Sequence, residues 1–175
     1  MVAVVVLAAG ASSRFGSPKQ QVLLAPVLER VRKAPSVGEI VVVVGAHAVS
    51  TDVRTIHCDD WADGPGASLR CGLAALPPEA EAAVVVLADG PRLAPEAIER
   101  VVAAWREGAG DVIAASYDGN RGHPVLLGRA IWSSVPDEGA RELDPVLIPC
   151  DDLGPPGDVD TPADLSGRAS ETDAE

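Results

Sequence analysis

The chain has 175 residues, of which 47% are hydrophobic and 23% charged, a composition typical of one compact globular domain. Aromatic residues make up only 3%, which largely excludes a stacking platform for single-stranded nucleic acid. The net charge of −12 also argues against binding of nucleic acid, because that affinity depends mainly on phosphate neutralisation by Lys and Arg.

The cysteine and hydropathy patterns bear on the cellular environment. No apolar stretch reaches the roughly 18 residues of a membrane-spanning helix, and the apolar segment 2–10 lacks the basic residues of a signal peptide. The three cysteines, Cys58, Cys71 and Cys150, form no C-x-x-C pair and are odd in number. We therefore expect buried thiols in a reducing compartment, and a soluble, cytoplasmic protein without membrane contact.

Apolar runs rich in Val and Ile alternate along the chain with helix-like stretches. Near-continuous apolar runs are typical of parallel strands that are covered on both faces. We expect the first four strands at Val2–Leu7, Ile40–Val44, Ala83–Leu87 and Val112–Ala115. Two shorter strands, one of them antiparallel, are expected at Pro124–Leu127 and Val146–Pro149.

Three helices are predicted between these strands, at Val22–Lys33, Ser68–Leu76 and Pro95–Trp105. The last is the clearest, because its apolar residues recur at helical spacing and a proline stands near its first turn. The alternation of strands and helices predicts an α/β fold, a three-layer sandwich with a mostly parallel, Rossmann-like sheet.

The chain shows no repeat and no internal linker, so residues 1–165 are expected to form a single domain. Its charge is uneven: residues 151–175 hold eight acidic residues and one basic residue, whereas the first 33 hold five basic residues and one acidic. A positive field near the N-terminus favours a small anion such as a nucleotide phosphate. Residues 166–175 offer almost no apolar surface and are predicted to be a flexible acidic tail.

A loop of small residues follows the first strand, from Ala8 to Gln20, and contains the cations Arg14 and Lys19. Small side chains allow backbone N–H groups to approach phosphate oxygens, and the two cations can neutralise their charge. The loop lies at the carboxyl end of a strand, where α/β sheets bind ligands. Neither a dinucleotide fingerprint nor a Walker loop fits, because Ser12 stands where the former needs glycine and the latter needs Gly-Lys-Ser/Thr.

Residues 7–20 read Leu-Ala-Ala-Gly-x-Ser-x-Arg-Phe-Gly-x-x-Lys-Gln, which is similar to the signature of the MobA-like NTP transferases, and in particular of molybdenum cofactor cytidylyltransferases. Five further segments resemble the family in the same order: 66–73, 88–91, 121–126, 139–141 and 158–164. The resemblance implies the fold of the nucleotide-diphospho-sugar transferases. It also implies nucleotide-binding residues: Leu7, Ala8, Ala9, Gly10, Ser12, Arg14, Lys19 and Ser68.

Nucleotidyl transfer needs charge neutralisation more than covalent catalysis, so carboxylates that hold Mg²⁺ are expected. Asp89 follows a buried strand and would lie beside the glycine-containing loop, while Asp160 lies in a late acidic segment that returns to the same edge. The resemblance favours Asp89 and Asp160 as metal ligands, with Asp158 and Asp164 as rivals for the second position. Asp89 is therefore expected to be catalytic, together with Arg14 and Lys19.

The resemblance also bears on the base and the acceptor. The Ala-Ala-Gly sequence in the first loop resembles that of the family members that use CTP, so Ala9 and Ser12 indicate cytosine as the base. The physical reason is that a Cβ at position 9 narrows the base pocket. Ser68 and Arg70 open a predicted helix whose N-terminal dipole favours an anion. His123 and Arg141 are expected at the acceptor pocket. His47 and His57 match no motif and are interpreted as structural.

Two segments depart from the family pattern. The stretch after Gln20 is shortened where the family has a turn that braces the nucleotide loop, which is expected to lower nucleotide affinity or to move Lys19. Gly90 replaces a larger residue, which is expected to loosen the backbone beside Asp89.

The first hypothesis is a Mg²⁺-dependent transferase that joins CMP from CTP to the phosphate of a molybdopterin-type cofactor, releases pyrophosphate and passes its product to a molybdoenzyme. Alternatives in the same class are guanylyl transfer, or cytidylyl transfer to another phosphorylated acceptor. A methylerythritol phosphate cytidylyltransferase is disfavoured, because the chain has no room for that enzyme's projecting arm. A nucleotide-binding regulatory or chaperone module without turnover is the alternative from another class.

Overall fold

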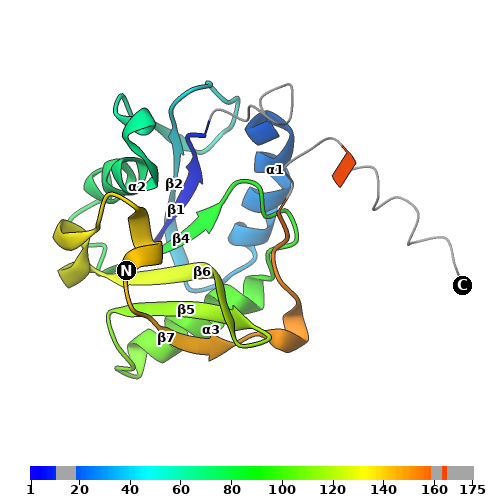
Figure 1. Ribbon diagram of the computed structural model, residues 1–175, viewed down its shortest axis with the longest axis vertical. Coiled ribbons are helices and arrows are strands. Elements are labelled where there is room, and N and C mark those ends of the chain that lie inside the picture. The colour runs from blue at the N-terminus through cyan, green and yellow to red at the C-terminus, as the bar shows by residue number, and fades with distance from the viewer. Residues whose placement is uncertain (11–18, 159–162, 165–175) are drawn as a thin grey trace, which may run out of the picture.

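The protein is described by a computed structural model that covers residues 1–10, 19–158 and 163–164. Its centre is one seven-stranded sheet with the strand order β3-β2-β1-β4-β6-β5-β7 (Figure 1). β1, β2, β3 and β4 run parallel to one another, β6 is antiparallel to β4 and β5, and β7 is parallel to β5. The strands are β1 (Val2–Ala8), β2 (Val37–Val44), β3 (Arg54–His57), β4 (Ala82–Leu87), β5 (Val112–Tyr117), β6 (Asn120–Gly128) and β7 (Val146–Pro149). The predicted mostly parallel sheet with an antiparallel member is confirmed.

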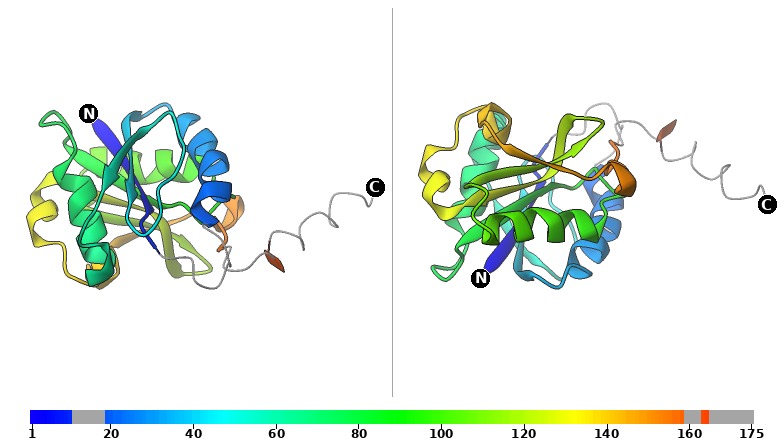
Figure 2. Two further views of the ribbon diagram at one scale, coloured as in Figure 1. Left: turned by 90° about the horizontal axis from the view of Figure 1, so that it is seen from above. Right: turned by 90° about the horizontal axis from the view of Figure 1, so that it is seen from below.

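Three helices cover the two faces of the sheet: α1 (Lys19–Arg32), α2 (Pro65–Ala74) and α3 (Pro95–Arg106). α1 and α3 lie on one face and α2 lies on the other, so the molecule has the three layers that the alternation of elements predicts (Figure 2). α1 begins at Lys19, so the shortened stretch after Gln20 continues as helix, with the exposed Pro26 inside it. No helix in the described part of the chain is long and apolar enough to cross a membrane.

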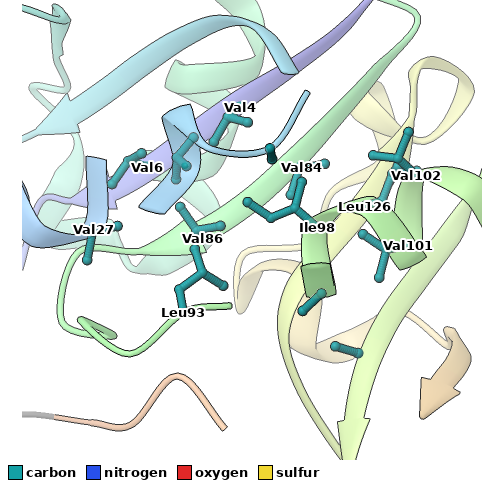
Figure 3. Packing of buried hydrophobic residues seen from close by; sticks show 14 of the residues in the cluster. Val4, Val6, Val27, Val84, Val86, Leu93, Ile98, Val101, Val102 and Leu126 are labelled. Carbon is teal, nitrogen blue, oxygen red and sulfur yellow. The ribbon is translucent and has the colours of Figure 1, made fainter. Parts of the chain in front are cut away.

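Two hydrophobic clusters hold the layers together, one on each face of the sheet. Successive residues of β1 alternate between them, because side chains along a strand point to opposite faces. Val4 and Val6 pack with Val27 of α1 and Ile98 of α3, as Figure 3 shows. The other cluster joins Ala3 and Val5 of β1 to the buried face of α2. Every residue from Val2 to Val6 is at most 3% exposed, which explains why a strand buried on both faces reads as a continuous apolar run.

The N-terminal end of α2 is fixed to the segment 135–138, which lies between two short 3₁₀ helices, Arg129–Ser134 and Gly139–Glu142. The Gly66 N–H donates to the carbonyl oxygen of Asp137 at 2.9 Å, and the Arg70 Nη1 donates to that of Val135, also at 2.9 Å. Gly66 permits this approach, because a Cβ there would lie 2.0 Å from the carbonyl oxygen of Pro136. The start of α2 therefore depends on a residue without a side chain.

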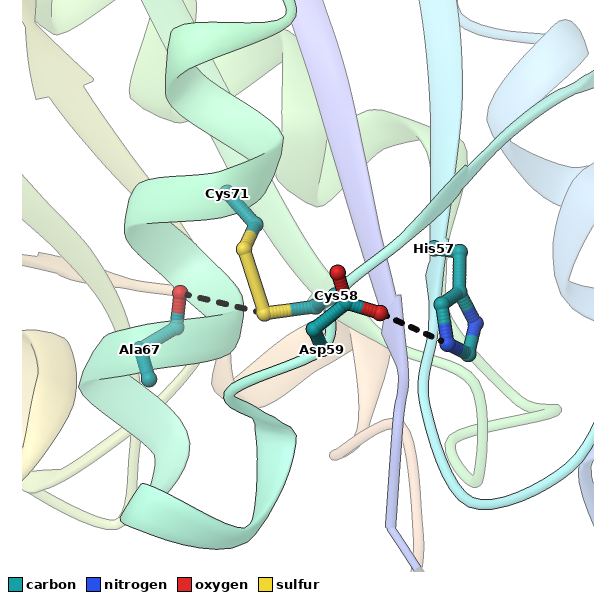
Figure 4. The surroundings of a disulfide bond; sticks show 5 residues. All are labelled: His57, Cys58, Asp59, Ala67 and Cys71. Atoms are coloured by element: carbon teal, nitrogen blue, oxygen red, sulfur yellow. Dashed lines mark hydrogen bonds and ion pairs between the residues drawn. A yellow bond between two sulfur atoms is a disulfide. The ribbon is translucent and has the colours of Figure 1, made fainter.

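A disulfide joins Cys58, which follows β3, to Cys71 on α2 (Figure 4). The expectation of three buried thiols is therefore wrong, and the inference of a reducing compartment loses the support of the cysteine count. The pairing arises because α2 packs on the sheet beside the end of β3, which brings the two Cα atoms within 5.9 Å. Cys150 is a free and buried thiol.

Gly66→Ala is expected to lower the free energy of unfolding by about 1–3 kcal/mol, because the added methyl group meets backbone carbonyls that cannot rotate away. Urea denaturation measures the change. Ala74→Ser, at an exposed position of the same helix, is the matched control and is expected to change stability by less than about 0.5 kcal/mol. An unchanged midpoint for Gly66→Ala would contradict the close packing.

Reduction of the disulfide is expected to cost about 3 kcal/mol of stability, because the bond closes a loop across 13 positions and restricts the unfolded chain. Denaturation with and without dithiothreitol tests this in the wild type and in Cys71→Ala. The reductant should lower the midpoint of the wild type and leave that of the variant unchanged. Equal responses in both proteins would mean that the bond does not contribute.

Candidate functional site

The candidate site lies at the carboxyl edge of the parallel strands. β1 pairs with β4 so that Leu7 lies opposite Leu87, and with β2 so that Ala8 lies opposite Val44. Beyond the strands, the Ala88 N–H donates to the carbonyl oxygen of Leu7 at 3.1 Å. Asp89, the next residue, is therefore held beside the loop that follows β1.

The structure describes the loop after β1 only as far as Gly10. Ala8 and Ala9 are buried, Leu7 is half-buried and Gly10 is exposed. The Ala46 N–H donates to the carbonyl oxygen of Ala9 at 3.2 Å, which ties this loop to the turn after β2. Ser12 and Arg14 lie outside the described residues, and Lys19 is described only as the first backbone position of α1.

A cavity of about 620 Å³ opens next to Asp89. Its walls come from three segments: the turn after β4, the β5–β6 hairpin with the start of β6, and residues Pro155–Asp158. The hairpin is fixed in place, because the Asp118 N–H donates to the carboxylate of Asp151. The cavity is therefore lined by residues that are far apart in the chain, from Val86 to Asp158.

Of the carboxylates that line the cavity, Asp89 and Asp158 are the two that the sequence analysis names as candidate metal ligands. The Oδ1 atom of Asp89 is shielded from solvent, whereas Asp158 is exposed. Two carboxylates fit Mg²⁺ or Mn²⁺, which take oxygen ligands and fill the remaining positions with waters and substrate phosphates. Within residues 1–10, 19–158 and 163–164 no three His, Cys, Asp or Glu side chains group closely enough to hold a metal ion. Asp160 lies outside the described residues, and Asp164 does not line the cavity.

His123 lines the cavity between an acidic and a basic side chain. Burial, with a smaller contribution from the positive charge of Arg121, lowers the pKa of His123 to about 4, while the charge of Asp89 opposes the shift. The imidazole is therefore neutral at pH 7. The peptide bond to Pro124 is cis, and the carbonyl oxygen of His123 accepts a hydrogen bond from the Tyr117 hydroxyl at 2.8 Å. Burial raises the pKa of that hydroxyl to about 12.

Arg121 is the only Lys or Arg among the described residues that line the cavity, and Arg141, which the resemblance assigns to the acceptor pocket, does not line it. Arg141 is exposed, forms an ion pair with Glu138 and does not line the cavity. Arg121 lines it, and its guanidinium donates to the backbone carbonyls of Ala140, Arg141 and Leu143. The signal for Arg121 was present in the sequence, because it begins the Arg-Gly-His-Pro segment that contains His123.

Two expectations about local structure need correction, the start of the second helix and the effect of Gly90. α2 begins at Pro65 and not at Ser68, so Ser68 is a buried residue of its first turns, and the Arg70 side chain braces segment 135–137. Gly90 does not loosen the backbone beside Asp89. A Cβ there would lie 2.9 Å from the Pro156 Cβ, and the Arg92 N–H donates to the Pro156 carbonyl at 2.9 Å. Gly90 therefore permits segment 155–158 to approach the turn that carries Asp89.

His123 makes stability depend on pH, and the sign follows from its lowered pKa. Between the ordinary value of 6.5 and the folded value of about 4, the unfolded chain binds the proton more readily than the folded protein. The stability that His123 contributes is complete above pH 6.5 and is lost as the pH falls toward 4. Urea midpoints at about pH 7 and about pH 4.5 should therefore differ less in His123→Gln than in the wild type. The exposed His57→Gln should keep the wild-type difference, and a His123→Gln profile identical to the wild type would contradict the shift.

Comparison with known proteins places this geometry in a family. Residues 4–145 match the MobA-like NTP transferase domain. The crystal structure of an Rv0371c homologue from Mycobacterium sp. strain JC1 is similar, with a TM-score of 0.79 and 26% identity over 95% of this chain and 93% of that chain. The crystal structure of Rv0371c from Mycobacterium tuberculosis has a TM-score of 0.74 and 27% identity, over 95% of this chain and 97% of that chain. The same protein in complex with manganese has a TM-score of 0.68 and 25% identity, over 95% of this chain and 96% of that chain.

More distant structures share the fold. A CMP:2-keto-3-deoxy-manno-octonic acid synthetase complexed with CTP has a TM-score of 0.71 and 15% identity over 95% of both chains. The search of curated proteins found no match. The fold is thus that of the nucleotide-diphospho-sugar transferases. With four fifths of its length matched, the chain belongs to the MobA-like NTP transferase family and is a nucleotidyltransferase.

Proposed function

We propose that the protein transfers CMP from CTP to the phosphate of a molybdopterin-type acceptor, with Mg²⁺ as its metal. The observation that carries the proposal is the position of Asp89, which lies between the loop after β1 and a cavity of about 620 Å³. The loop is the proposed nucleotide side of the site and the cavity is the proposed acceptor side. The manganese complex of the Rv0371c relative supports a divalent cation.

The proposed reaction is an in-line displacement at the α-phosphorus of CTP. An oxygen of the acceptor phosphate forms the new P–O bond as the bond to the bridging oxygen breaks, and pyrophosphate leaves with the electron pair. A bound divalent cation neutralises the charge of the phosphates. In this proposal Asp89 and Asp160 hold the cation, with Asp158 as the rival for the second ligand, and Arg14 and Lys19 neutralise the triphosphate.

No strong base is required in this reaction. A terminal phosphate has lost most of its second proton near neutral pH, so its oxygen is already a nucleophile. This agrees with His123, whose lowered pKa leaves it neutral at pH 7. His123 therefore shapes the acceptor cavity and does not need to accept a proton.

The proposed choice of cytosine depends on the first loop. Ala9 is only 7% exposed, and its carbonyl is tied to the turn after β2, so its methyl group has little room to move. A fixed methyl at this position narrows the base site and disfavours a purine. Ser12 and Ser68 complete the proposed nucleotide contacts, together with the backbone of residues 7–10.

Asp89→Asn is expected to lower the rate of pyrophosphate release on the order of 100-fold or more, because it removes a charged ligand of the cation. Release is measured with Mg²⁺ and molybdenum cofactor, comparing CTP, GTP and ATP. Asp111→Asn is the matched control, because Asp111 is exposed and lies outside the site. Asp111 precedes β5, and β5 runs in the same direction as β4, so Asp111 lies at the amino ends of these strands, whereas Asp89 lies at their carboxyl ends.

Each outcome of that assay decides a part of the proposal. Release with CTP alone, lost in Asp89→Asn and kept in Asp111→Asn, would support the chemistry and the base. A preference for GTP would overturn the base and leave the mechanism intact. If no nucleotide gives turnover, a CTP-binding titration separates a different acceptor from a non-catalytic nucleotide-binding module.

A further inference from the structure

The cavity beside Asp89 carries a marked imbalance of charge. Asp89, Asp118 and Asp158 all line it, whereas Arg121 is the only Lys or Arg among its described lining residues. His123 adds no charge at neutral pH. Among the described lining residues, Arg121 is therefore the one whose charge attracts an anionic ligand.

The Arg121 guanidinium is held rigidly by groups that do not cancel its charge. It donates from Nη1 to the carbonyl oxygens of Leu143 at 2.6 Å and Arg141 at 3.2 Å, and from Nη2 to that of Ala140. These acceptors are neutral carbonyls. Burial lowers the pKa of Arg121 and the nearby Asp144 opposes the shift, but a guanidinium remains charged in proteins.

Three of the five N–H bonds of the guanidinium are used by these carbonyls. The remaining two are on Nε and Nη2, two nitrogens that can donate together to a phosphate in the bidentate geometry that arginine favours. The three carbonyl contacts have already fixed the side chain, so binding a phosphate here costs little further rotamer entropy.

We propose that Arg121 positions the phosphate of the acceptor, through its Nε and Nη2 donors, against the β6 wall of the cavity. This deepens the proposed function and rests on it for the identity of the phosphate as the nucleophile. On the described walls no second Lys or Arg competes for the phosphate, so Arg121 sets its position. Arg121 is a positioning residue, and the turn at 139–143, which comprises the 3₁₀ helix Gly139–Glu142 and Leu143, holds its guanidinium in place.

A competing explanation is that Arg121 only fastens the turn at 139–143 to β6. The two roles differ in what a substitution changes. A purely structural residue affects stability but not the affinity of the cavity for phosphate. A phosphate-positioning residue affects that affinity even in a variant that remains folded.

The test is a titration with inorganic phosphate, without nucleotide or metal and at constant ionic strength, followed by NMR of the Arg121 Nε–H, the Gly122 amide and the His123 ring. We expect saturating shifts at all three groups in the wild type and in Arg141→Gln, the matched exposed control. In Arg121→Gln the shifts of Gly122 and His123 should need at least about 10-fold more phosphate, as the loss of a charge-assisted pair predicts. Arg121→Lys keeps the charge without the fork, should also bind more weakly than the wild type, and serves if Arg121→Gln does not fold.

Turnover then separates this proposal from the proposed function. In an active enzyme Arg121→Gln should raise the KM for the acceptor at least about 10-fold and change the KM for CTP less than about twofold. The proposal is overturned if Arg121→Gln, or Arg121→Lys in its place, loses stability but binds phosphate as the wild type does, or if phosphate leaves the Arg121 Nε–H signal unmoved. If phosphate binds as expected and no nucleotide is turned over, the proposed function fails while the role of Arg121 as a phosphate site stands.

Discussion

The parallel pairing of β1 with β4 is the constraint on which the site depends. Residues 2–7 pair in register with residues 82–87, and the next hydrogen bond, from Ala88 to Leu7, extends this order beyond the strands. A slip of one residue would exchange the side chains that face the two hydrophobic clusters. Because both faces are buried, the register is strongly specified, and with it the position of Asp89 beside the loop after β1. The position of the proposed metal ligand is thus a consequence of how Val and Ala side chains pack.

The elements with a continuous apolar pattern could be predicted from the sequence, and the elements without one could not. β1 and β4 are predicted to within one residue, and the apolar parts of β2 and β5 are predicted without the first three residues of β2 and the last two of β5. β3 (Arg54–His57) is a polar strand at the edge of the sheet and was missed. α2 begins three residues before its predicted start, because Pro65 and Gly66 are stabilised by a distant segment that local sequence does not reveal. The Cys58–Cys71 bond was missed for the same reason: only the packing of α2 on the sheet brings the two residues together.

The site divides in a similar way. The location of Asp89 follows from a strand pattern, and the presence of His123 at a cavity follows from a motif. Arg121 and Arg141 both belong to family-like segments, and the backbone path decides that Arg121 lines the cavity; its place next to His123 in the sequence was the available clue. Gly90 shows a related limit. Its lack of a side chain suggested freedom of the backbone, but in the structure it serves close packing against Pro156.

One wall of the cavity comes from a part of the chain that lies beyond the family match. The family match ends at residue 145, whereas Pro155–Asp158 follow β7 and close the cavity opposite the β5–β6 hairpin. The loop after β1 and the turn with Asp89 both lie inside the matched region. A change in the length or sequence of residues 155–158 would therefore reshape this wall of the cavity and leave intact the β1–β4 pairing, which positions Asp89.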